Sequence, residues 1–363
     1  LKTELIEIRD RYGDERKTEI QDVEDEIDIE DLIDEEDCVY TLTHNGYIKR
    51  LPTAEYRAQG RGGKGVKAMA TREEDYVETV FTASTHDSIL FFTNLGKVYV
   101  RKGYRIPEAG RSARGQNIVN IIPTDPGEKV SAMIAGRGIA EDNYLVFVTR
   151  DGTVKRTAQS AFKNIRSNGI RALSLDEGDE LITVLQTGGE DKILLATHDG
   201  MAICFNETDA RAMGRDAVGV RGIRLREGDF VVGAGIAAEG SAILSITENG
   251  YGKRTDVGEY SVQNRGGMGL KNYNVTDKTG PIADVVIVHG GEDLLVISDD
   301  GTIIRMDVGS ISLLSRSTQG VRVMRLTGEA KVISIAPTDK ESDADEGSTD
   351  TETAIEAGGE SDS

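Results

Sequence analysis

Apolar and polar residues alternate in a unit that recurs six times along the chain after Cys38. Each unit has an apolar strand, a turn that ends in glycine, and a second strand that in most copies carries basic residues. Asn or Asp precedes the glycine in five of the six turns, which predicts type I′ hairpins. The turns read Thr43-His44-Asn45-Gly46, Thr93-Asn94-Leu95-Gly96, Thr149-Arg150-Asp151-Gly152, Thr197-His198-Asp199-Gly200, Thr247-Glu248-Asn249-Gly250 and Ser298-Asp299-Asp300-Gly301.

The hairpin glycines are spaced 50, 56, 48, 50 and 51 residues apart. A second glycine follows each of them after 19 residues, or after 17 in the third unit. These second glycines are Gly65, Gly115, Gly169, Gly219, Gly269 and Gly320. A period near 50 with several short strands is typical of propeller blades. We therefore predict an all-β, six-bladed, propeller-like ring over residues 38–338.

The segments outside the ring have different patterns. Residues 1–20 begin with apolar side chains at helical spacing and predict the end of a longer helix. Residues 21–37 are an acidic linker or a short docked segment, and residues 339–363 are expected to form an acidic, disordered tail. Because the chain starts with Leu1 and not with Met, we expect it to belong to a longer protein.

Charge is distributed very unevenly along the chain. The formal net charge is −20, yet residues 19–37 hold 12 acids without Lys or Arg, and residues 339–363 hold 10 acids with one Lys. These two segments carry −21 together, which leaves +1 for the remaining residues. Because the body of the protein is nearly neutral, its acidic composition does not exclude a nucleic-acid partner.

Basic residues recur at matching places in the units. The second strands carry Lys49, Arg50, Arg101, Lys102, Lys155, Arg156, Lys253, Arg254 and Arg305, and the fourth unit has none there. The loops before the second glycines carry Arg61, Arg114, Arg166, Arg215, Arg265 and Arg316. Another base follows in most units, at Lys67, Arg171, Arg221, Lys271 and Arg322. Equivalent positions in a ring share one rim, so we expect a basic band that binds the phosphates of duplex DNA.

The sequence favours binding of the DNA backbone over base readout or catalysis. It has no recognition-helix pattern, zinc spacing or interleaved aromatic residues. The four histidines, His44, His86, His198 and His289, do not cluster, and no nucleophile–base pair or P-loop appears. Cys38 and Cys204 lie in apolar runs and are expected to be reduced core thiols of a cytoplasmic protein. We expect no metal or cofactor in this chain and no membrane partner.

The second loop of the first unit has the most distinctive sequence. It reads Gln59-Gly60-Arg61-Gly62-Gly63-Lys64-Gly65. Glycine allows close approach of the backbone, and the two cations suit an anionic partner. The alternative is a surface turn with incidental charges. The fifth unit comes nearest with Gln263-Asn264-Arg265-Gly266-Gly267-Met268-Gly269, where Met replaces the Lys.

This loop resembles the box Q-(R/K)-R-G-G-(R/K)-G of the C-terminal domains of bacterial-type DNA gyrase A subunits. The six units and the leading Tyr12-Gly13-Asp14-Glu15-Arg16 match that family as well. The resemblance covers the chain apart from the acidic tail. One departure is Gly60, where the family has Arg or Lys, and it keeps the related domain of a topoisomerase IV A subunit as an alternative.

The resemblance implies a β-pinwheel in which blades exchange strands and DNA wraps around the rim. It implies that the box, residues 59–65, is required for negative supercoiling by an ATP-hydrolysing type IIA topoisomerase. The implied partners are duplex DNA, the gyrase B subunit and a second A subunit in an A2B2 complex, with ATP and Mg bound by that holoenzyme. The chain itself is expected to be monomeric, non-catalytic and associated with the nucleoid, and residues 1–20 to end a coiled-coil region.

Two interpretations from other classes stay open. A protein-interaction propeller, RCC1-like or kelch-like, would not bend short duplexes. An enzyme with a pocket on the ring axis would need acidic or His residues that converge there. The acidic tail either only keeps the chain in solution or competes with DNA for the basic rim.

Overall fold

The computed structural model describes residues 2–13, 29–43, 45–53, 66–67, 77–110, 113–136 and 143–338. The chain divides into two compact units, residues 1–34 and residues 35–363. The first unit contains α1 (Lys2–Tyr12) and the 3-10 helix η1 (Ile29–Leu32). After α1 the N–H of Gly13 donates to the Arg9 carbonyl at 2.7 Å. The helix predicted at the start of the chain is thereby confirmed.

The second unit consists of blades that each run from an inner to an outer strand. Blade 1 holds β4 (Val77–Ser84), β1 (Asp37–Thr43), β2 (Tyr47–Pro52) and β7 (Gln116–Asn117), and blade 2 holds β8 (Val130–Gly136), β5 (Ser88–Thr93), β6 (Lys97–Lys102) and β11 (Ile170–Arg171). Blade 3 holds β12 (Leu181–Thr187), β9 (Tyr144–Thr149), β10 (Thr153–Ala158) and β15 (Val220–Arg221), and blade 4 holds β16 (Val231–Ile236), β13 (Lys192–Thr197), β14 (Met201–Asn206) and β19 (Leu270–Lys271). Blade 5 holds β20 (Ile282–Val288), β17 (Ala242–Thr247), β18 (Tyr251–Asp256) and β23 (Val321–Arg322), and blade 6 holds β24 (Val332–Thr338), β21 (Asp293–Ser298), β22 (Thr302–Asp307) and β3 (Val66–Lys67).

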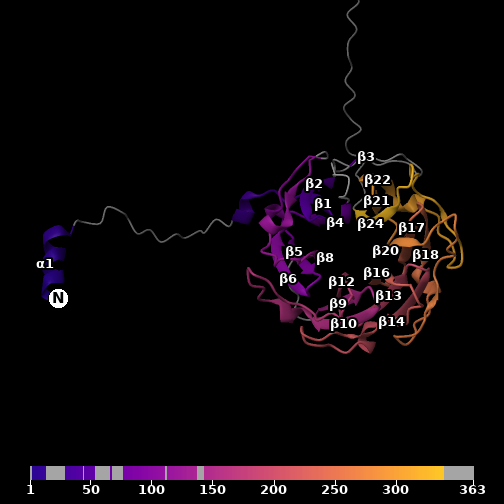
Figure 1. Cartoon of the computed structure of the whole chain (residues 1–363), viewed down its shortest axis with the longest axis horizontal. Coiled ribbons are helices and arrows are strands. Elements are labelled where there is room, and N and C mark those ends of the chain that lie inside the picture. Colours follow the sequence, from indigo (N-terminus) through magenta and orange to yellow (C-terminus); the bar gives the residue numbers. More distant parts are fainter. Residues whose placement is uncertain are drawn as a thin grey trace, which may run out of the picture. The chain divides into compact units, whose positions relative to one another are not determined.

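Within the described residues these six four-stranded sheets form a closed ring (Figure 1). The inner strands of neighbouring blades contact one another all the way round, from β4 to β24 and back to β4. Short 3-10 helices follow the outer long strands: η3 (Gly103–Arg105), η5 (Gln159–Phe162), η6 (Glu207–Asp209), η7 (Val257–Glu259) and η8 (Val308–Ser310), with η4 (Ile118–Asn120) after β7. The predicted all-β, six-bladed ring is confirmed.

The outermost strand of each blade is only two residues long and comes from another repeat. In blade 1, β7 of the second repeat pairs with β2, so that Gln116 stands opposite Ile48. In blade 6 the outer strand is β3 of the first repeat, where Val66 stands opposite Ile303 and Lys67 opposite Thr302. Strand exchange therefore links consecutive blades and also closes the ring.

The apolar core lies between the blades. Neighbouring residues of one middle strand face different blades, since Val39 packs in a cluster with Leu295 of blade 6 while Tyr40 packs with Phe91 of blade 2. Both faces of a middle strand are covered, and for this reason these strands are continuous apolar runs. Cys38 and Cys204 are buried free thiols in this core, as predicted, and burial raises the pKa of both.

The hairpin turns correct the prediction of type I′ geometry. The N–H of Gly46 donates to the Thr43 carbonyl at 2.8 Å, which makes the glycine the fourth residue of the turn and not a central one. The six hairpin glycines have φ between 71° and 85°. This arrangement is a three-residue loop that ends in a glycine bulge. The Thr that begins each of the first five turns has a role too, since Oγ1 of Thr43 accepts the N–H of Tyr47 at 3.0 Å.

The seam between blades 6 and 1 contains a buried ion pair. Nε of Arg305 donates to Oδ2 of Asp293 at 2.8 Å, and both side chains are 3% exposed. Nη1 of Arg305 donates to the Thr53 carbonyl at 3.1 Å. Blade 6 therefore holds the chain on both sides of residues 54–65, at Thr53 through Arg305 and at β3 through β22.

Replacement of Arg305 tests the importance of this seam. Arg305→Met removes the guanidinium that pairs with the buried Asp293 carboxylate, and we expect a loss of about 3–5 kcal/mol in the free energy of unfolding. The double variant Arg305→Met with Asp293→Leu should recover most of that loss, because no charge is then left uncompensated. Urea denaturation of the three proteins measures both effects. A single variant as stable as the parent would show that the pair does not hold the seam.

Candidate nucleic-acid interface

The box predicted to anchor DNA, Gln59, Gly60, Arg61, Gly62, Gly63, Lys64 and Gly65, lies outside the described residues. Its flanks are described, and both lie against the outer long strand of blade 6. The chain enters this loop after Thr53, which Arg305 holds, and leaves it at β3, which pairs with β22. Of Lys67, another predicted rim residue, the structure describes the backbone in β3.

Three of the predicted rim lysines are buried in the described chain. Lys49, Lys155 and Lys253 stand three residues after the hairpin glycines of blades 1, 3 and 5 and are 0–1% exposed. Nζ of Lys253 donates to the carbonyls of Ser315 and Arg316 at 2.7 and 2.6 Å. Nζ of Lys49 likewise reaches two carbonyls of the next repeat's second loop, at 2.9 and 3.1 Å. Burial lowers the pKa of each of the three ammonium groups to about 8.

The burial of Lys49, Lys155 and Lys253 corrects the expectation that every repeated base lies on a common rim. The ammonium groups donate their hydrogen bonds to backbone carbonyls of the neighbouring loops. They shape the loops of blades 2, 4 and 6 from beneath and do not present their charge at the surface. Their contribution to any interface is to fix the loops that carry other bases.

The arginines that follow these lysines are also engaged within the protein. Nε of Arg50 donates to the Ile106 carbonyl at 3.0 Å, and Nε of Arg254 donates to the Ile311 carbonyl at 2.8 Å. Nη1 of Arg156 lies 3.5 Å from Oε2 of the buried Glu207. These side chains, with Arg305, therefore join the end of an outer long strand to a neighbouring blade.

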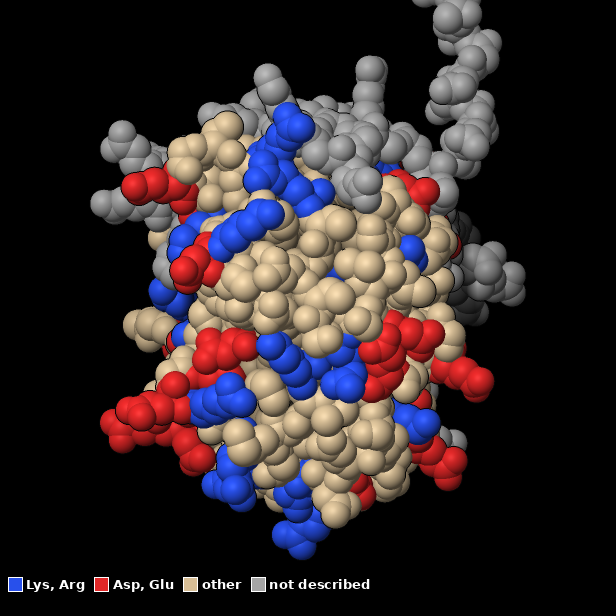
Figure 2. Space-filling model, turned by 90° about the vertical axis from the view of Figure 1, so that its right-hand side faces the viewer, with Lys and Arg blue, Asp and Glu red and all other residues tan. Residues whose placement is uncertain are grey.

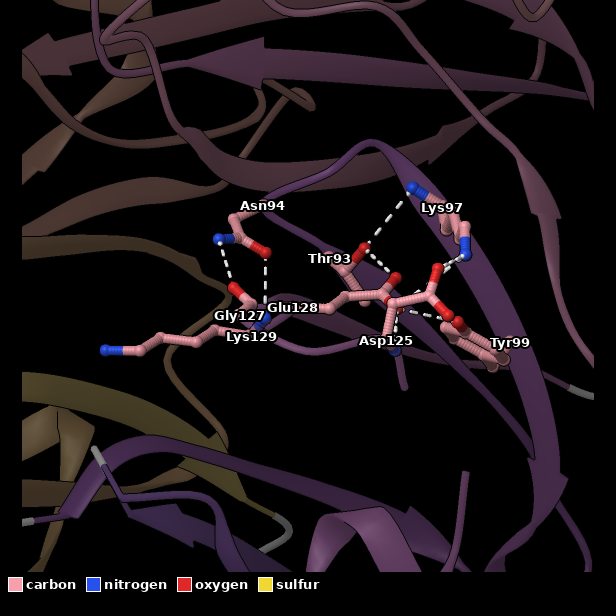
Figure 3. Close-up of polar contacts among 8 residues, drawn as sticks. All are labelled: Thr93, Asn94, Lys97, Tyr99, Asp125, Gly127, Glu128 and Lys129. Carbon is pink, nitrogen blue, oxygen red and sulfur yellow. Dashed lines mark hydrogen bonds and ion pairs between the residues drawn. The ribbon is translucent and has the colours of Figure 1, made fainter. Parts of the chain in front are cut away.

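Blade 2 departs from this scheme. Arg101 and Lys102 stand two residues later than the other basic pairs, and they donate to the carbonyls of Ile121 at 2.8 Å and of His86 at 3.2 Å. Tyr99 occupies the place of the buried lysine. Its hydroxyl donates to Oε2 of Glu128 at 2.8 Å, while Oγ1 of Thr93 donates to Oε1 at 2.7 Å (Figure 3). Burial, followed by the bond to Glu128, raises the pKa of Tyr99 to about 12.

Lys97 and Asn94 complete this cluster around the hairpin of blade 2. Nζ of Lys97 forms an ion pair with Asp125, which raises the pKa of the Lys97 ammonium (Figure 3). Asn94 accepts the N–H of Lys129 at 2.7 Å and donates to the Gly127 carbonyl at 3.3 Å. Because these side chains bind one another, the cluster stabilises the blade and offers no open site.

Four exposed bases lie on the exchanged outer strands. Arg171, Arg221, Lys271 and Arg322 end β11, β15, β19 and β23, and their side chains are exposed. Three loop arginines each donate through Nη1 to the backbone carbonyl of such a residue: Arg215 to Arg171 at 3.4 Å, Arg265 to Arg221 at 3.0 Å, and Arg316 to Lys271 at 3.2 Å. Strand exchange thereby brings two cations from consecutive repeats together at each of these places.

Aromatic rings hold two further bases. The guanidinium of Arg114 lies 3.5 Å from the ring centre of Tyr47, a cation–π contact. Nη2 of Arg322 donates to the Tyr251 hydroxyl at 2.7 Å, which lowers the pKa of Tyr251. Arg166, in the second loop of blade 3, has an exposed side chain.

Several exposed bases were missed in the sequence: Lys163, Arg211, Arg224, Arg226 and Arg325. A signal existed for two of them, since Arg224 and Arg325 follow Arg221 and Arg322 by three residues. On the face shown in Figure 2, Lys and Arg gather in separate groups, and Asp and Glu lie beside several of them. The bases on this face form a series of separate groups and not the continuous band that was expected.

The inner strands of the ring line a cavity. Its volume is about 320 Å³, and Asp284 is the one ionisable side chain among its described lining residues. Burial raises the pKa of Asp284 to about 7. Its carboxylate accepts the N–H of Val285 at 2.7 Å and of Ile335 at 3.0 Å, and thus joins blades 5 and 6. The described residues hold no cluster of three or more His, Cys, Asp or Glu side chains suited to a metal ion.

Fold and surface together define a class: a strand-exchanged, six-bladed β-propeller in which four of the exchanged outer strands end in an exposed cation. A family model described as the DNA gyrase C-terminal domain, β-propeller, matches residues 39–84, 87–135, 143–187, 191–238, 242–289 and 292–339, one segment for each blade. The chain belongs to this DNA gyrase C-terminal domain family.

Curated relatives and solved structures agree with this assignment. The DNA gyrase A subunit of Staphylococcus aureus strain MRSA252 is 48% identical over 367 residues, which are 99% of this chain and 41% of that protein. A structure of a DNA gyrase A C-terminal domain matches with a TM-score of 0.77 and 28% identity, over 84% of this chain and all of that one. The C-terminal domain of a DNA topoisomerase IV matches with a TM-score of 0.64 and 27% identity, over 85% of this chain and 94% of that one. The chain thus spans about two fifths of the length of the curated relative.

No helix in the described part of the chain is long and apolar enough to cross a membrane.

The buried lysines predict a particular pH dependence of stability. Lys253 has a pKa of about 8 in the folded chain and an ordinary value of 10.5, so between these pH values the unfolded chain binds more protons. The free energy of unfolding should therefore rise with pH across this window, by about 1–3 kcal/mol for this lysine. Lys253→Met should lack this part of the rise, whereas Lys271→Met, which removes an exposed lysine, should keep it. Urea denaturation at pH 7.5 and pH 10 measures the difference, and parallel curves for all three proteins would contradict the assignment.

Proposed function

We propose that this domain binds, bends and wraps duplex DNA without reading its sequence, and that this wrapping supports negative supercoiling by an ATP-dependent gyrase holoenzyme. The observation that carries the proposal is the recurrence of paired cations on the exchanged strands, Arg171 with Arg215, Arg221 with Arg265, and Lys271 with Arg316. Each pair joins one exposed base to a loop arginine of the next repeat. Repeated cation pairs along a curved edge suit the repeated phosphates of DNA.

The energetics favour many contacts of modest strength. Bending a 20–30 bp site by 40–90° costs about 1–6 kcal/mol, and bending through a half turn costs on the order of ten or more. No single exposed cation offsets that cost. Contacts distributed over successive blades do so together, and the release of counterions makes the binding depend strongly on salt.

The box, residues 59–65, is the proposed anchor of the wrapped DNA. Support comes from its two cations, its glycine-rich backbone and the attachment of its flanks to blade 6 through Arg305 and β3. Gly60 removes one of the cations that the family box carries, so Arg61 and Lys64 supply its charge in this chain. Thr53 and β3, the described residues on either side of the box in the sequence, lie at the seam where the ring closes, so an anchor between them gives the DNA a fixed starting point.

The remaining parts of the proposed machine lie outside this chain. The curated relative is named as the A subunit of DNA gyrase, and the chain corresponds to two fifths of its length. We infer that DNA cleavage and ATP hydrolysis, with its Mg, belong to the rest of the A subunit and to the B subunit in an A2B2 holoenzyme. The chain supplies the wrapping surface and no catalytic group, and it acts in the cytoplasm on the nucleoid.

Substitution of the box cations tests the anchor. In the holoenzyme, Arg61→Ala with Lys64→Ala should abolish negative supercoiling and spare ATP-independent relaxation, because the wrapped segment loses its fixed end. Topoisomer gels of relaxed and supercoiled plasmid report the two activities. The charge-matched control Arg224→Ala with Arg226→Ala should keep most supercoiling. Unchanged supercoiling by the box variant would exclude residues 59–65 as the anchor.

Exposed bases of the outer strands should set the salt dependence of DNA binding. Arg171→Ala, Arg221→Ala and Lys271→Ala together should make the slope of log affinity against log salt shallower by about 0.9 for each lost phosphate contact. A control that removes three lysines outside the exchanged strands, Lys129, Lys192 and Lys331, should leave the slope nearly unchanged. Fluorescence anisotropy with a labelled duplex at several salt concentrations measures both. Equal slopes for the parent and the outer-strand variant would contradict the proposed interface.

A second candidate is the wrapping domain of a topoisomerase IV A subunit. It is favoured by the match of the fold to such a domain, with a TM-score of 0.64, and by the departure at Gly60. Nicked circles ligated in the presence of the chain test the choice, because trapped positive supercoils would support the gyrase domain. Linking numbers unaffected by the chain would instead support a protein-interaction propeller.

A further inference from the structure

A basic hollow lies on the outer edge where the second loops of blades 3 and 4 meet. Its volume is about 590 Å³. The described lining combines cations and side-chain amides from two consecutive repeats with a single carboxylate, and its polar members are Ser160, Lys163, Asn164, Arg166, Asn168, Arg171, Arg215 and Asp216. Only Arg166, Arg171 and Arg215 were predicted as rim residues from the sequence.

The blade 3 wall of this hollow is fixed at both ends. Phe162, which ends η5, is 1% exposed and packs against Phe147 with ring centres 6.1 Å apart. Gly169, at the other end, has φ of 76° and lies against the ring of Tyr99, where a Cβ atom would come within 2.7 Å of the ring. Tyr99 is itself held by Glu128 (Figure 3). The segment between these two anchors, which carries Lys163 and Arg166, is therefore placed before any ligand arrives.

The blade 4 wall is fixed from beneath. The buried ammonium of Lys155 donates to the carbonyls of Arg215 and Ala172, the latter at 2.8 Å. The Arg215 guanidinium donates to the Arg171 carbonyl at 3.4 Å and so stays on the side of the hollow. Its partner there is a neutral carbonyl, and no ion pair between described residues offsets the positive charge of Arg215.

The arginines of the hollow call for an anion. Among its described lining residues the guanidinium groups of Arg166, Arg171 and Arg215 outnumber the one carboxylate, that of Asp216, which lies 3.9 Å from Arg171 with 80% of its side chain exposed. Guanidinium groups bind phosphate oxygens as a fork, and the Asn amides add neutral donors. A phosphodiester group offers two anionic oxygens and fits within a concave site that several donors surround.

We propose that this hollow, built by Lys163, Asn164, Arg166, Asn168, Arg171 and Arg215, binds a backbone phosphate of duplex DNA and is a second anchor besides the box. The inference deepens the proposed function and rests on it. The other exposed cation pairs join two bases, whereas this place joins four bases and two amides. Figure 1 shows β3, which directly follows the box, and β10, beside the hollow, on opposite sides of the ring. Two anchors so placed hold the DNA to its bent path over a large part of the ring.

The test removes two cations of the hollow and compares the result with an equal loss of charge elsewhere. Lys163→Ala with Arg166→Ala leaves Tyr99, Phe162 and Lys155 in place, and the control is Arg224→Ala with Arg226→Ala. With the 363-residue chain and a 40-bp duplex as probe, the hollow variant should lose about tenfold or more in affinity, against a few-fold for the control. Phosphate-ethylation interference should lose one or two adjacent positions in the hollow variant alone.

The possible outcomes separate this inference from the proposed function. If the parent chain neither binds nor bends the duplex, both the proposed function and the second anchor are overturned. If the parent bends DNA but the two variants behave alike, only the anchor is overturned. If inorganic phosphate shifts the NMR signals of Lys163 and Arg166 while both variants bind DNA equally, the hollow takes free phosphate and the DNA anchor is again overturned. Arg166→Lys, which keeps the charge, should retain most of the affinity, and equal unfolding midpoints exclude a folding defect as the cause of any loss.

Discussion

The pairing of a two-residue strand with the sheet of the blade before it is the interaction on which this structure depends. Only two residues pair in each case, as Gln116–Asn117 do with Ile48 and Tyr47, yet the step recurs around the ring and ends with Val66 on Ile303. The loop in front of each short strand must cross from one blade to the next. The exchange therefore puts the loops that carry arginine, and the bases that end the short strands, on the outer edge of the ring.

The basic side chains of this domain fall into a buried set and an exposed set. Lys49, Lys155 and Lys253 are buried and hold the crossing loops by their carbonyls, while Arg171, Arg221 and Lys271 lie exposed a short distance away. The buried ammonium groups lose hydration and keep their place through hydrogen bonds. Because the backbone between the two sets is fixed, the exposed cations are positioned before they meet a partner. Positioned donors lose less conformational entropy on binding than free side chains do.

The repeat, the number of blades and the all-β class could be predicted because the hairpin and loop glycines recur at nearly constant spacing. The turn type could not, since Asn-Gly suits both a two-residue loop and the last two residues of a three-residue loop, and only the bond from Gly46 to Thr43 decides between them. The burial of the three lysines could not be predicted for a related reason. Lys253 is buried by carbonyls some sixty residues further along the chain, at Ser315 and Arg316, and no local pattern contains that contact.

The bases of the exchanged strands were easier to place. Arg171 and Arg221 follow the second glycine of their repeats at the same offset, and the structure puts both on the outer edge. Arg101 and Lys102 were grouped with the other basic pairs because they are adjacent cations, although they stand two residues later, and Tyr99 takes the structural position instead. The hollow between blades 3 and 4 depends on side chains of two repeats, and sequence spacing within one repeat cannot reveal it.

Closure by β3 also sets an order in which the domain can be completed during synthesis. Each of the other short strands pairs with a sheet whose long strands have already left the ribosome. β3 leaves early, yet its partner strand β22 belongs to the last repeat. β3 of the first repeat therefore stays unpaired until the sixth repeat has been synthesised. Contacts between residues so distant in sequence form slowly. A ribosome-bound chain that lacks the sixth repeat is an open array of blades with an unpaired edge at each end, and the ring forms only after that repeat has left the ribosome.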